Sequence, residues 1–332
     1  MIDAAVVGLG RWGKTLVASV QGRSGRLRFT HAVTGHPEQH RDFLDEHRIE
    51  PVGELAAVLA DPAIGAVVLA TPHSRHLEQI LAVAATGKAV FCEKPLTLTR
   101  ADAVRAIAAC RAAGVVLGIG TDKRYFPAMR ELVRTVESGR LGPLLHLEAH
   151  FSNEVAGAAG ISPWREDPDE SPAGGLTGTG VHMLDALIKL GGPVRRVWAR
   201  LLTHKPPPDP LDSLAVLLEF ESGVSGTLAA IRSTPLYFRV HAFGRQGSAE
   251  ALGRTELVLR QSGAEPQPLH FPEQDSVRDN LEAFAEAVSG GAPYPIGTSE
   301  ILDVVAAFEA ITEAVAGGGG PIDVGGEPRA ER

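Results

Sequence analysis

The stretch AAVVGLGRWGKTLVASV, residues 4–20, decides the fold of the first part of this chain. Its apolar, β-branched beginning over 4–8 predicts a strand, and the segment 13–22 has the composition of a helix. A glycine-rich turn joins the two. A strand that passes through such a turn into a helix opens a βαβ unit, which indicates an α/β fold.

The turn has a GxGxxG spacing. Gly8 allows the tight turn, Gly10 lets a diphosphate approach the backbone, and Gly13 lets the helix pack closely on the strand. The helix N-terminus adds N–H groups and a positive dipole end. A glycine turn without a ligand is the alternative, but the flanking strand and helix favour dinucleotide binding. The expected contacts are Gly8, Leu9, Gly10, Arg11, Trp12 and Gly13.

The same alternation continues to about residue 121. Strands with almost no internal polar positions, separated by amphipathic helices, predict a parallel sheet covered on both faces. Right-handed crossovers between such strands give a doubly wound sheet. Further strands are expected at 27–34, 65–71, 89–95 and 115–120, and helices at 37–47, 74–87 and 99–114.

After residue 122 the pattern changes. Strand-like runs follow one another without intervening helices, and Ser222-Gly223 is typical of a hairpin turn, which together indicate an open, mainly antiparallel sheet. The strands are expected at 144–151, 195–202, 213–221, 224–232, 237–244 and 255–260, and the helices at 127–139, 181–191, 275–289 and 298–316. We therefore expect a Rossmann domain over 1–121, an α+β domain over 122–316 and a Gly-rich tail over 317–332.

Composition limits the possible partners. The 332 residues carry a formal net charge of −8, so no basic face is expected to neutralise nucleic-acid phosphates. Cys92 and Cys110 have no metal-like spacing and suggest no disulfide framework. The start MIDAAVVGLG lacks the basic flank of a secretory signal, and no apolar run is long enough to span a bilayer. We expect a cytoplasmic protein with no metal and no nucleic-acid or membrane partner.

The second strand ends in AVTGHP, where an acid that binds the ribose hydroxyls of NAD is expected. Thr34, Gly35 and His36 supply none. Without a carboxylate there is no repulsion of a 2′-phosphate, and Thr34 and His36 can donate hydrogen bonds to one. The pattern slightly favours NADP over NAD. Plain turn residues beside bound NAD are the alternative.

The third strand ends in ATPHSRH, at the sheet edge where α/β proteins bind ligands. Thr71, Pro72 and His73 are therefore expected beside the cofactor. A histidine at this point is as readily a helix-start residue as a ligand contact. His76 lies inside the following helix, and we expect it to support the cofactor site structurally.

The fourth strand leads into Glu93-Lys94-Pro95 at the same edge. Proline restricts Lys94 to extended backbone angles, which fixes where the ammonium group leaves the strand. Lys94 can then bind a substrate hydroxyl or ketone near the nicotinamide and stabilise negative charge on that oxygen. Glu93 can orient Lys94 or bind the nicotinamide ribose. An adjacent Glu-Lys pair is by itself most often solvated, but the glycine turn at the same edge favours a site.

GLGRWG, ATPHSRH and VFCEKPLTLT together resemble segments of the glucose–fructose oxidoreductase, inositol dehydrogenase and MocA (Gfo/Idh/MocA) family. The likeness continues through GTDKRYFPAMREL, SGRLGPLLHL, SPWRED and GGLTGTGVHMLDAL, and so covers nearly the whole chain. It implies an NAD(P)-dependent oxidoreductase that acts on a sugar, cyclitol or related polyol. It also implies that the second domain binds substrate and that its open sheet face forms dimers or tetramers.

In this family the later segment usually reads Gly-Gly, then Asp-x-Gly-x-His-x-x-Asp, on a helix that faces the nicotinamide. The present chain matches at Gly180, His182 and Asp185, with Gly178 in the first acidic position. The resemblance implies that His182 is the general acid/base, which suits an imidazole because its unperturbed pKa lies near neutrality. Asp185, at i+3, can orient or polarise it. A helix-start histidine in a polar loop is the alternative.

Gly178 leaves three interpretations open, because an aspartate there would help to bind the reacting hydroxyl. First, Lys94 and His182 suffice for a dehydrogenase with altered substrate contacts. Second, the cofactor serves a transient oxidation, as in family relatives that cleave or rearrange glycosidic substrates. Third, the chain binds a dinucleotide without turnover. We rank them in that order.

The predicted reaction is hydride transfer between a carbinol carbon and the nicotinamide, with Lys94 positioning the oxygen and His182 moving the proton. This mechanism requires the two side chains to flank one nicotinamide ring. Tryptophan is more often packed than bound to a ligand, so packing is the alternative for Trp164. The substrate contacts expected from the resemblance are Lys94, Arg124, Tyr125, Trp164, Arg165 and His182.

Overall fold

The structure is a computed structural model that describes residues 1–153, 164, 167–203, 212–232 and 234–325. The chain folds into two compact units, each with most of its contacts within itself. Unit 1 comprises Met1–Asp122 and Asp275–Ile301, and unit 2 comprises Lys123–Gln274 and Leu302–Arg332. The sequence analysis divided the chain once, after residue 121, whereas the structure adds Asp275–Ile301 to the first unit.

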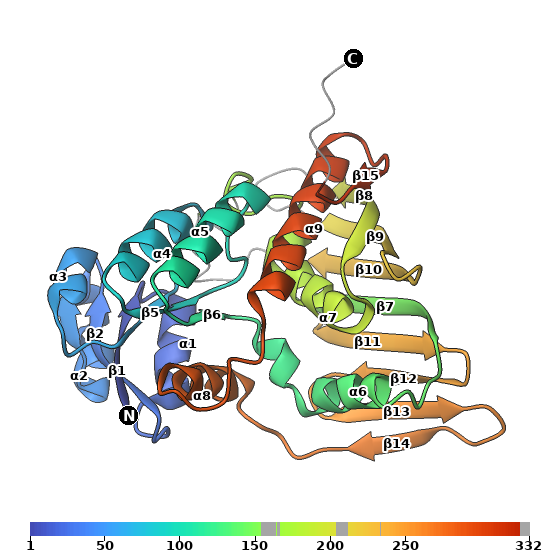
Figure 1. The fold of residues 1–332 in the computed structure, drawn as a ribbon, viewed down its shortest axis with the longest axis horizontal. Coiled ribbons are helices and arrows are strands. Elements are labelled where there is room, and N and C mark those ends of the chain that lie inside the picture. Colours follow the sequence, from blue (N-terminus) through green and yellow to red (C-terminus); the bar gives the residue numbers. More distant parts are fainter. Residues whose placement is uncertain (154–163, 165–166, 204–211, 233, 326–332) are drawn as a thin grey trace. The chain divides into compact units, whose positions relative to one another are not determined.

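Unit 1 is built on a six-stranded parallel sheet in the order β3-β2-β1-β4-β5-β6 (Figure 1). Every residue of β4 and β5 is buried, as expected for strands covered on both faces. The strands are β1 (Ile2–Val7), β2 (Leu27–Val33), β3 (Glu50–Val52), β4 (Ala66–Leu69), β5 (Ala89–Cys92) and β6 (Leu117–Ile119). The helices are α1 (Arg11–Val20), α2 (Arg41–His47), α3 (Leu55–Ala60), α4 (His76–Ala85), α5 (Arg100–Ala112) and α8 (Ser276–Val288).

The strand order reverses between β1 and β4. Open α/β sheets bind their ligands at such a switch point, outside the carboxyl ends of the strands. The turns that follow β1, β4 and β5 therefore lie where a dinucleotide is expected.

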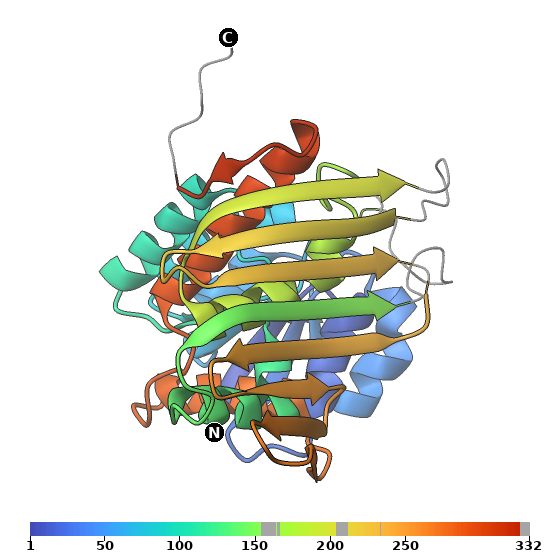
Figure 2. The ribbon, with the colours of Figure 1, turned by 90° about the vertical axis from the view of Figure 1, so that its right-hand side faces the viewer.

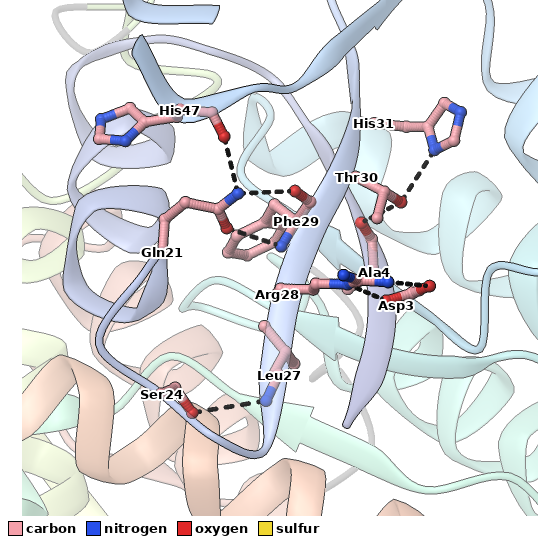
Figure 3. Close-up of polar contacts among 10 residues, drawn as sticks. All are labelled: Asp3, Ala4, Gln21, Ser24, Leu27, Arg28, Phe29, Thr30, His31 and His47. Carbon is pink, nitrogen blue, oxygen red and sulfur yellow. Dashed lines mark hydrogen bonds and ion pairs between the residues drawn. The ribbon is translucent and has the colours of Figure 1, made fainter.

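A single glutamine fixes the end of α1 against β2 and α2 (Figure 3). The Gln21 side chain exchanges two hydrogen bonds with the Phe29 backbone, each 3.0 Å, and donates a third to the His47 carbonyl at 2.8 Å. One side-chain amide therefore satisfies three backbone groups and connects the end of α1 to both β2 and α2.

Helix α8 returns to unit 1 from far along the chain. The Asn280 amide donates to the Ile119 carbonyl at 2.9 Å, and the Tyr294 hydroxyl donates to the same carbonyl at 3.0 Å. The Phe284 ring packs edge-on against Phe91 with centroids 5.4 Å apart. These contacts attach α8 to β5 and β6 beside α1.

Unit 2 is built on a nine-stranded sheet in the order β14-β13-β12-β11-β7-β10-β9-β8-β15. Strands β7 and β10 pair in parallel, and the other neighbouring strands that the structure describes are antiparallel. The strands are β7 (Leu144–Asn153), β8 (Val194–Thr203), β9 (Asp212–Phe220), β10 (Ser225–Arg232), β11 (Tyr237–Gly244), β12 (Gly247–Leu252), β13 (Glu256–Gln261), β14 (Gln267–His270) and β15 (Ile322–Asp323). The longer helices are α6 (Pro127–Glu137), α7 (Val181–Gly191) and α9 (Thr298–Ala316), of which α9 begins in unit 1.

The two faces of this sheet differ in character. Along β7, Leu147, Ala149 and Phe151 are buried, and α6 and α7 pack on the sheet. Figure 2 shows the other face, whose strands no helix crosses. That open face presents polar side chains, including the Arg239 guanidinium, which donates to Glu148 and Glu250, each at 2.6 Å.

The predicted fold class is confirmed: a doubly wound parallel sheet precedes an α+β unit with a mainly antiparallel sheet. The Ser222-Gly223 turn joins β9 to β10 as expected, and the Thr99 hydroxyl caps α5 by accepting the Asp102 N–H at 3.2 Å. Four short strands and one helix were not predicted from the sequence: β3, β12, β14, β15 and α3. Among the described residues, no helix combines the length and hydrophobicity needed to cross a membrane.

Candidate active site

The glycine turn after β1 has the geometry that its spacing predicts. Gly8 has φ of 95°, and a Cβ there would lie 2.6 Å from the Ala70 carbonyl oxygen. A Cβ on Gly13 would overlap the Gly8 carbonyl. Both positions therefore need glycine, the first for its backbone angle and the second for the close approach of α1 to β1.

Gly10 differs from the other two glycines because no neighbouring group of the described residues packs against its α-carbon. It is exposed, and a Cβ built there would meet no atom within 4 Å. It precedes α1, whose first-turn N–H groups point out of the helix end, and no side chain caps that end through Gly10. The open space and the helix N-terminus fit the diphosphate of a dinucleotide, with Leu9, Arg11 and Trp12 in the same turn.

The end of β2 holds Thr34 and His36. The buried Thr34 hydroxyl oxygen accepts the His36 backbone N–H at 3.3 Å, while the His36 ring is exposed. Glu38, two residues further along the chain, places its carboxylate 3.5 Å from that ring. The sequence analysis looked for an acid at the strand end and missed this one, which comes from the short helix after it.

The turn after β4 contains Thr71, Pro72 and His73. The Thr71 hydroxyl donates to the Gln79 side chain at 2.6 Å. His73 is buried, and its ring meets His76 edge-on with centroids 5.6 Å apart.

His76 joins this turn to the one after β5. Its Nδ1 lies 3.0 Å from the Pro95 carbonyl and 3.1 Å from the Leu96 carbonyl, and its Nε2 lies 3.2 Å from the Thr71 carbonyl. The side chain is fully buried. These contacts connect the backbone of the turn after β4 with the backbone of the turn after β5.

Glu93 and Lys94 follow β5 directly. The Glu93 backbone N–H still donates to Leu69 of β4 at 2.9 Å, so the residue is held by the sheet. Only 7% of Glu93 is exposed, which excludes a solvated surface pair. Burial raises the pKa of Glu93 to about 7, although Trp12 and Lys94 favour its charged form. Lys94, followed by a cis peptide bond to Pro95, is partly exposed at this edge.

In unit 2, His182 lies in the first turn of α7. A π-helical turn, η5 (Leu176–Gly180), runs directly into that helix, and such turns are frequent at functional sites. The His182 ring is 95% buried and lies 6.2 Å from the Phe151 ring. The N-terminal end of α7 thus carries a buried imidazole.

Asp185 and Arg124 form a buried ion pair in the same unit. The Arg124 Nε and Nη2 donate to the two Asp185 oxygens at 2.7 and 2.8 Å. Their side chains are 10% and 4% exposed. The sequence analysis predicted that Arg124 binds substrate and that Asp185 orients His182. In the structure, Arg124 makes a bidentate contact with Asp185.

The remaining predicted residues are not part of this ion pair. Tyr125 is buried, with the Arg130 guanidinium 5.0 Å from its ring centre. Trp164 is partly buried, and Arg165 lies outside the described residues. Gly178 is exposed, and a Cβ there would meet no described atom within 4 Å. Across the described ranges, no group of three His, Cys, Asp or Glu residues could hold a metal.

The glycine turn at the switch point of a six-stranded parallel sheet defines unit 1 as a dinucleotide-binding domain. Residues 2–121 match the family described as "Oxidoreductase family, NAD-binding Rossmann fold". Residues 129–250 match the family described as "GFO/IDH/MocA C-terminal domain". The chain belongs to the Gfo/Idh/MocA oxidoreductase family, and it is an NAD(P)-binding oxidoreductase of that family.

The proteins similar to this chain include both dehydrogenases and a hydratase. Inositol 2-dehydrogenase 2 of Saccharopolyspora erythraea is 30% identical over 250 residues, which cover 70% of this chain and 69% of the relative. A 2,7-anhydro-N-acetylneuraminate hydratase of Escherichia coli is 28% identical over 233 residues, 69% of this chain and 61% of the relative. A levoglucosan dehydrogenase solved with NADH and levoglucosan is similar in fold, with a TM-score of 0.86, 20% identity and coverage of 98% and 100%.

Proposed function

We propose that this oxidoreductase is a dehydrogenase that transfers a hydride between NAD(P) and a carbinol carbon of a sugar, cyclitol or related polyol. The observation that carries the proposal is that Lys94 follows β5 at the same carboxyl edge of the parallel sheet as the Gly8–Gly13 turn after β1. The names of the inositol and levoglucosan dehydrogenases support the substrate class.

In this proposal Lys94 donates a hydrogen bond to the reacting oxygen and stabilises the negative charge that develops there. His182 accepts or returns the proton of that oxygen. Asp185, paired with Arg124, lies one helical turn after His182 and is proposed to hold the first turns of α7 in place. The bound nicotinamide supplies the hydride chemistry.

For the cofactor we propose either NAD or NADP, with His36 favouring the 2′-phosphate of NADP. The exposed imidazole can donate to a phosphate, while the Thr34 hydroxyl already accepts the His36 N–H. The Glu38 carboxylate, 3.5 Å from the ring, opposes this preference by repelling the phosphate. The preference for NADP is therefore small.

The first test is a panel of inositols, aldoses, anhydrosugars and polyols with each nucleotide, followed by the absorbance of the reduced nicotinamide. We expect turnover with at least one substrate, and Lys94→Ala should lower kcat by roughly 10²–10⁴-fold. The dissociation constant of the dinucleotide should change little. Lys189→Ala, which removes a partly exposed lysine that pairs with Glu137, is the matched control and should keep full activity.

A double substitution tests whether Lys94 and His182 serve one reaction. If both act on the same substrate oxygen, Lys94→Ala with His182→Ala should cost about as much as the worse single change, because groups that act as a unit are not additive. Losses that multiply would show independent roles and would contradict the proposed mechanism.

A second candidate function rests on Gly178. With glycine at 178, the chain would hold the cofactor for a transient oxidation of the substrate, and the name of the hydratase relative supports this alternative. Substrate that disappears without net cofactor reduction would favour it. Dinucleotide binding without turnover on any member of the panel would favour a non-catalytic role.

We also propose a homodimer or homotetramer formed through the open face of the nine-stranded sheet. A hollow of about 550 Å³ on that face is lined by side chains that include Trp198, Leu217 and Arg239. Trp198 and Leu217 are apolar, and Arg239 with Glu148 supplies opposite charges for a symmetric partner. Sedimentation of the wild type and of Leu217→Glu, which should dissociate, tests this assembly.

A further inference from the structure

Glu93 is a buried carboxyl group with few donors around it. Its Oε2 accepts the Lys94 backbone N–H at a long 3.3 Å. Its Oε1 is buried and has no hydrogen-bond partner among the described residues. A buried, charged oxygen without a donor is costly, so this carboxyl group is under pressure to take up a proton. If this position had only a structural role, a side chain without an ionisable group would serve it at lower cost.

Gly120, just after β6, leaves the space that this carboxyl group occupies. A Cβ on Gly120 would overlap Oε1 and would lie 2.5 Å from Cδ and 2.6 Å from Oε2 of Glu93. Its backbone does not have a positive φ, so no turn conformation requires glycine there. The glycine is needed because the Glu93 carboxyl group lies directly on its α-carbon.

The groups that face Glu93 come from several elements. Trp12 of α1 and Lys94 favour the charged carboxylate, whereas burial and the Asp122 charge disfavour it. Asp122 itself accepts a hydrogen bond from the Ser276 hydroxyl at 3.2 Å. The neighbouring Cys92 thiol has its pKa raised, first by burial and then by Glu93, so it stays protonated. Burial is the largest of these influences, and together they raise the pKa of Glu93 to about 7.

We propose that Glu93 positions Lys94 and that this effect depends on whether the Glu93 carboxyl group is charged. Gly120 leaves the space that the carboxyl group occupies, and Trp12 favours its charged form. This inference rests on the proposed function only through the role of Lys94. When Glu93 is charged, its carboxylate accepts the Lys94 N–H and stabilises the ammonium group. When it takes a proton from solvent, both effects weaken. Trp12 lies in the dinucleotide turn, so it connects cofactor binding to the charge beside Lys94.

The test begins with the protein without nucleotide, so that it does not depend on turnover. Glutamate is labelled with ¹³C at the carboxyl carbon, and the resonances are followed from about pH 5 to 9. We expect one resonance to titrate near neutrality and to disappear in Glu93→Gln. Trp12→Phe removes the indole N–H but keeps an aromatic ring, and should move that midpoint to higher pH. Trp198→Phe, on the open sheet face, is the matched control and should leave it unchanged.

Activity supplies the second readout. In the wild type, log kcat against pH should show a limb at the Glu93 midpoint, and that limb should be absent in Glu93→Gln and shifted upward in Trp12→Phe. Gly120→Ala should abolish the midpoint by displacing the carboxyl group, with Gly53→Ala, which has open space for a Cβ, as its control. If Gly120→Ala fails to fold, Trp12→Phe still decides.

The outcomes separate the two proposals. No carboxyl resonance titrating near neutrality, or one that survives in Glu93→Gln, would overturn the inference even if the dehydrogenase reaction is found. A midpoint that behaves as expected in a protein with no dehydrogenase turnover would instead overturn the proposed function and leave the titration standing. A midpoint unmoved by Trp12→Phe would remove Trp12 from the arrangement.

Discussion

At the scale of single residues, the site depends on where side chains are missing as well as on where they are present. Gly8, Gly13 and Gly120 each leave space that another backbone or side-chain group fills. At Gly10 and Gly178, a Cβ would meet no atom of the described part of the chain within 4 Å. The first set holds the framework together, and the second set marks positions where a ligand or an additional side chain can be accommodated.

Gly178 supports a direct prediction. Because a Cβ there meets no atom of the described residues within 4 Å and its backbone has no positive φ, Gly178→Asp should fold with little cost. The new carboxylate lies four residues before His182, about one helical turn away. Its negative charge should favour the positively charged imidazole of His182 and so move a limb of the pH–kcat profile to higher pH. The kinetic profile on the best panel substrate measures this shift.

Gly178→Asn is the matched control, since it has the same shape without the charge. It should leave the limb where it is in the wild type. A limb that moves equally in both variants would mean that the effect is steric and that position 178 does not act on His182 through charge.

At the scale of elements, sequence periodicity predicted the main strands of unit 1 because strongly apolar runs are bounded by glycine and helix caps. It missed β3 and α3 because elements of three and six residues show too little periodicity. It also divided the chain once. The return of α8 to unit 1 depends on Asn280 and Tyr294 reaching Ile119, a contact across 161 residues or more that no local pattern records.

The α8 attachment leads to a stability prediction. The Tyr294 hydroxyl donates to the Ile119 carbonyl and lies 2.7 Å from the Asn280 side chain, so Tyr294→Phe leaves buried polar groups with fewer partners. It should cost unit 1 about 1–3 kcal/mol. Hydrogen exchange of the β6 amides, which reports the opening of unit 1 itself, should accelerate accordingly. Tyr237→Phe, on an exposed tyrosine of unit 2, should leave those rates unchanged.

At the scale of the whole molecule, the chemistry of the site was partly visible in the sequence. The glycine turn and Glu93-Lys94 could be predicted because each follows a recognisable strand. The Arg124–Asp185 ion pair could not, because it joins residues 61 apart and local spacing does not encode such contacts. Glu38 and Gly120 were missed for a different reason: their importance appears only when a neighbouring turn is placed beside them.

The open face of the nine-stranded sheet carries the last prediction. His241 lies there among Arg239, Glu250 and Arg260, and burial lowers its pKa to about 4. Its Nδ1 lies 3.0 Å from the Arg239 guanidinium, so the neutral ring is an acceptor in the folded state. In the unfolded chain the imidazole has its ordinary pKa of about 6.5. The unfolded state therefore binds more protons between these two values, and unit 2 should lose stability as the pH falls from about 6.5 towards 4.

Because charged neighbours and solvent screen part of this effect, we expect a loss of about 1–2 kcal/mol over that interval. Urea unfolding of the wild type followed through Trp198 fluorescence should show it, and His241→Gln should flatten the dependence by removing the titrating ring. His270→Gln, which removes an exposed histidine of the same sheet, should keep the wild-type dependence. An unchanged slope in His241→Gln would place the acid sensitivity of the sheet in other groups, among them the Glu148 and Glu250 carboxylates that hold Arg239.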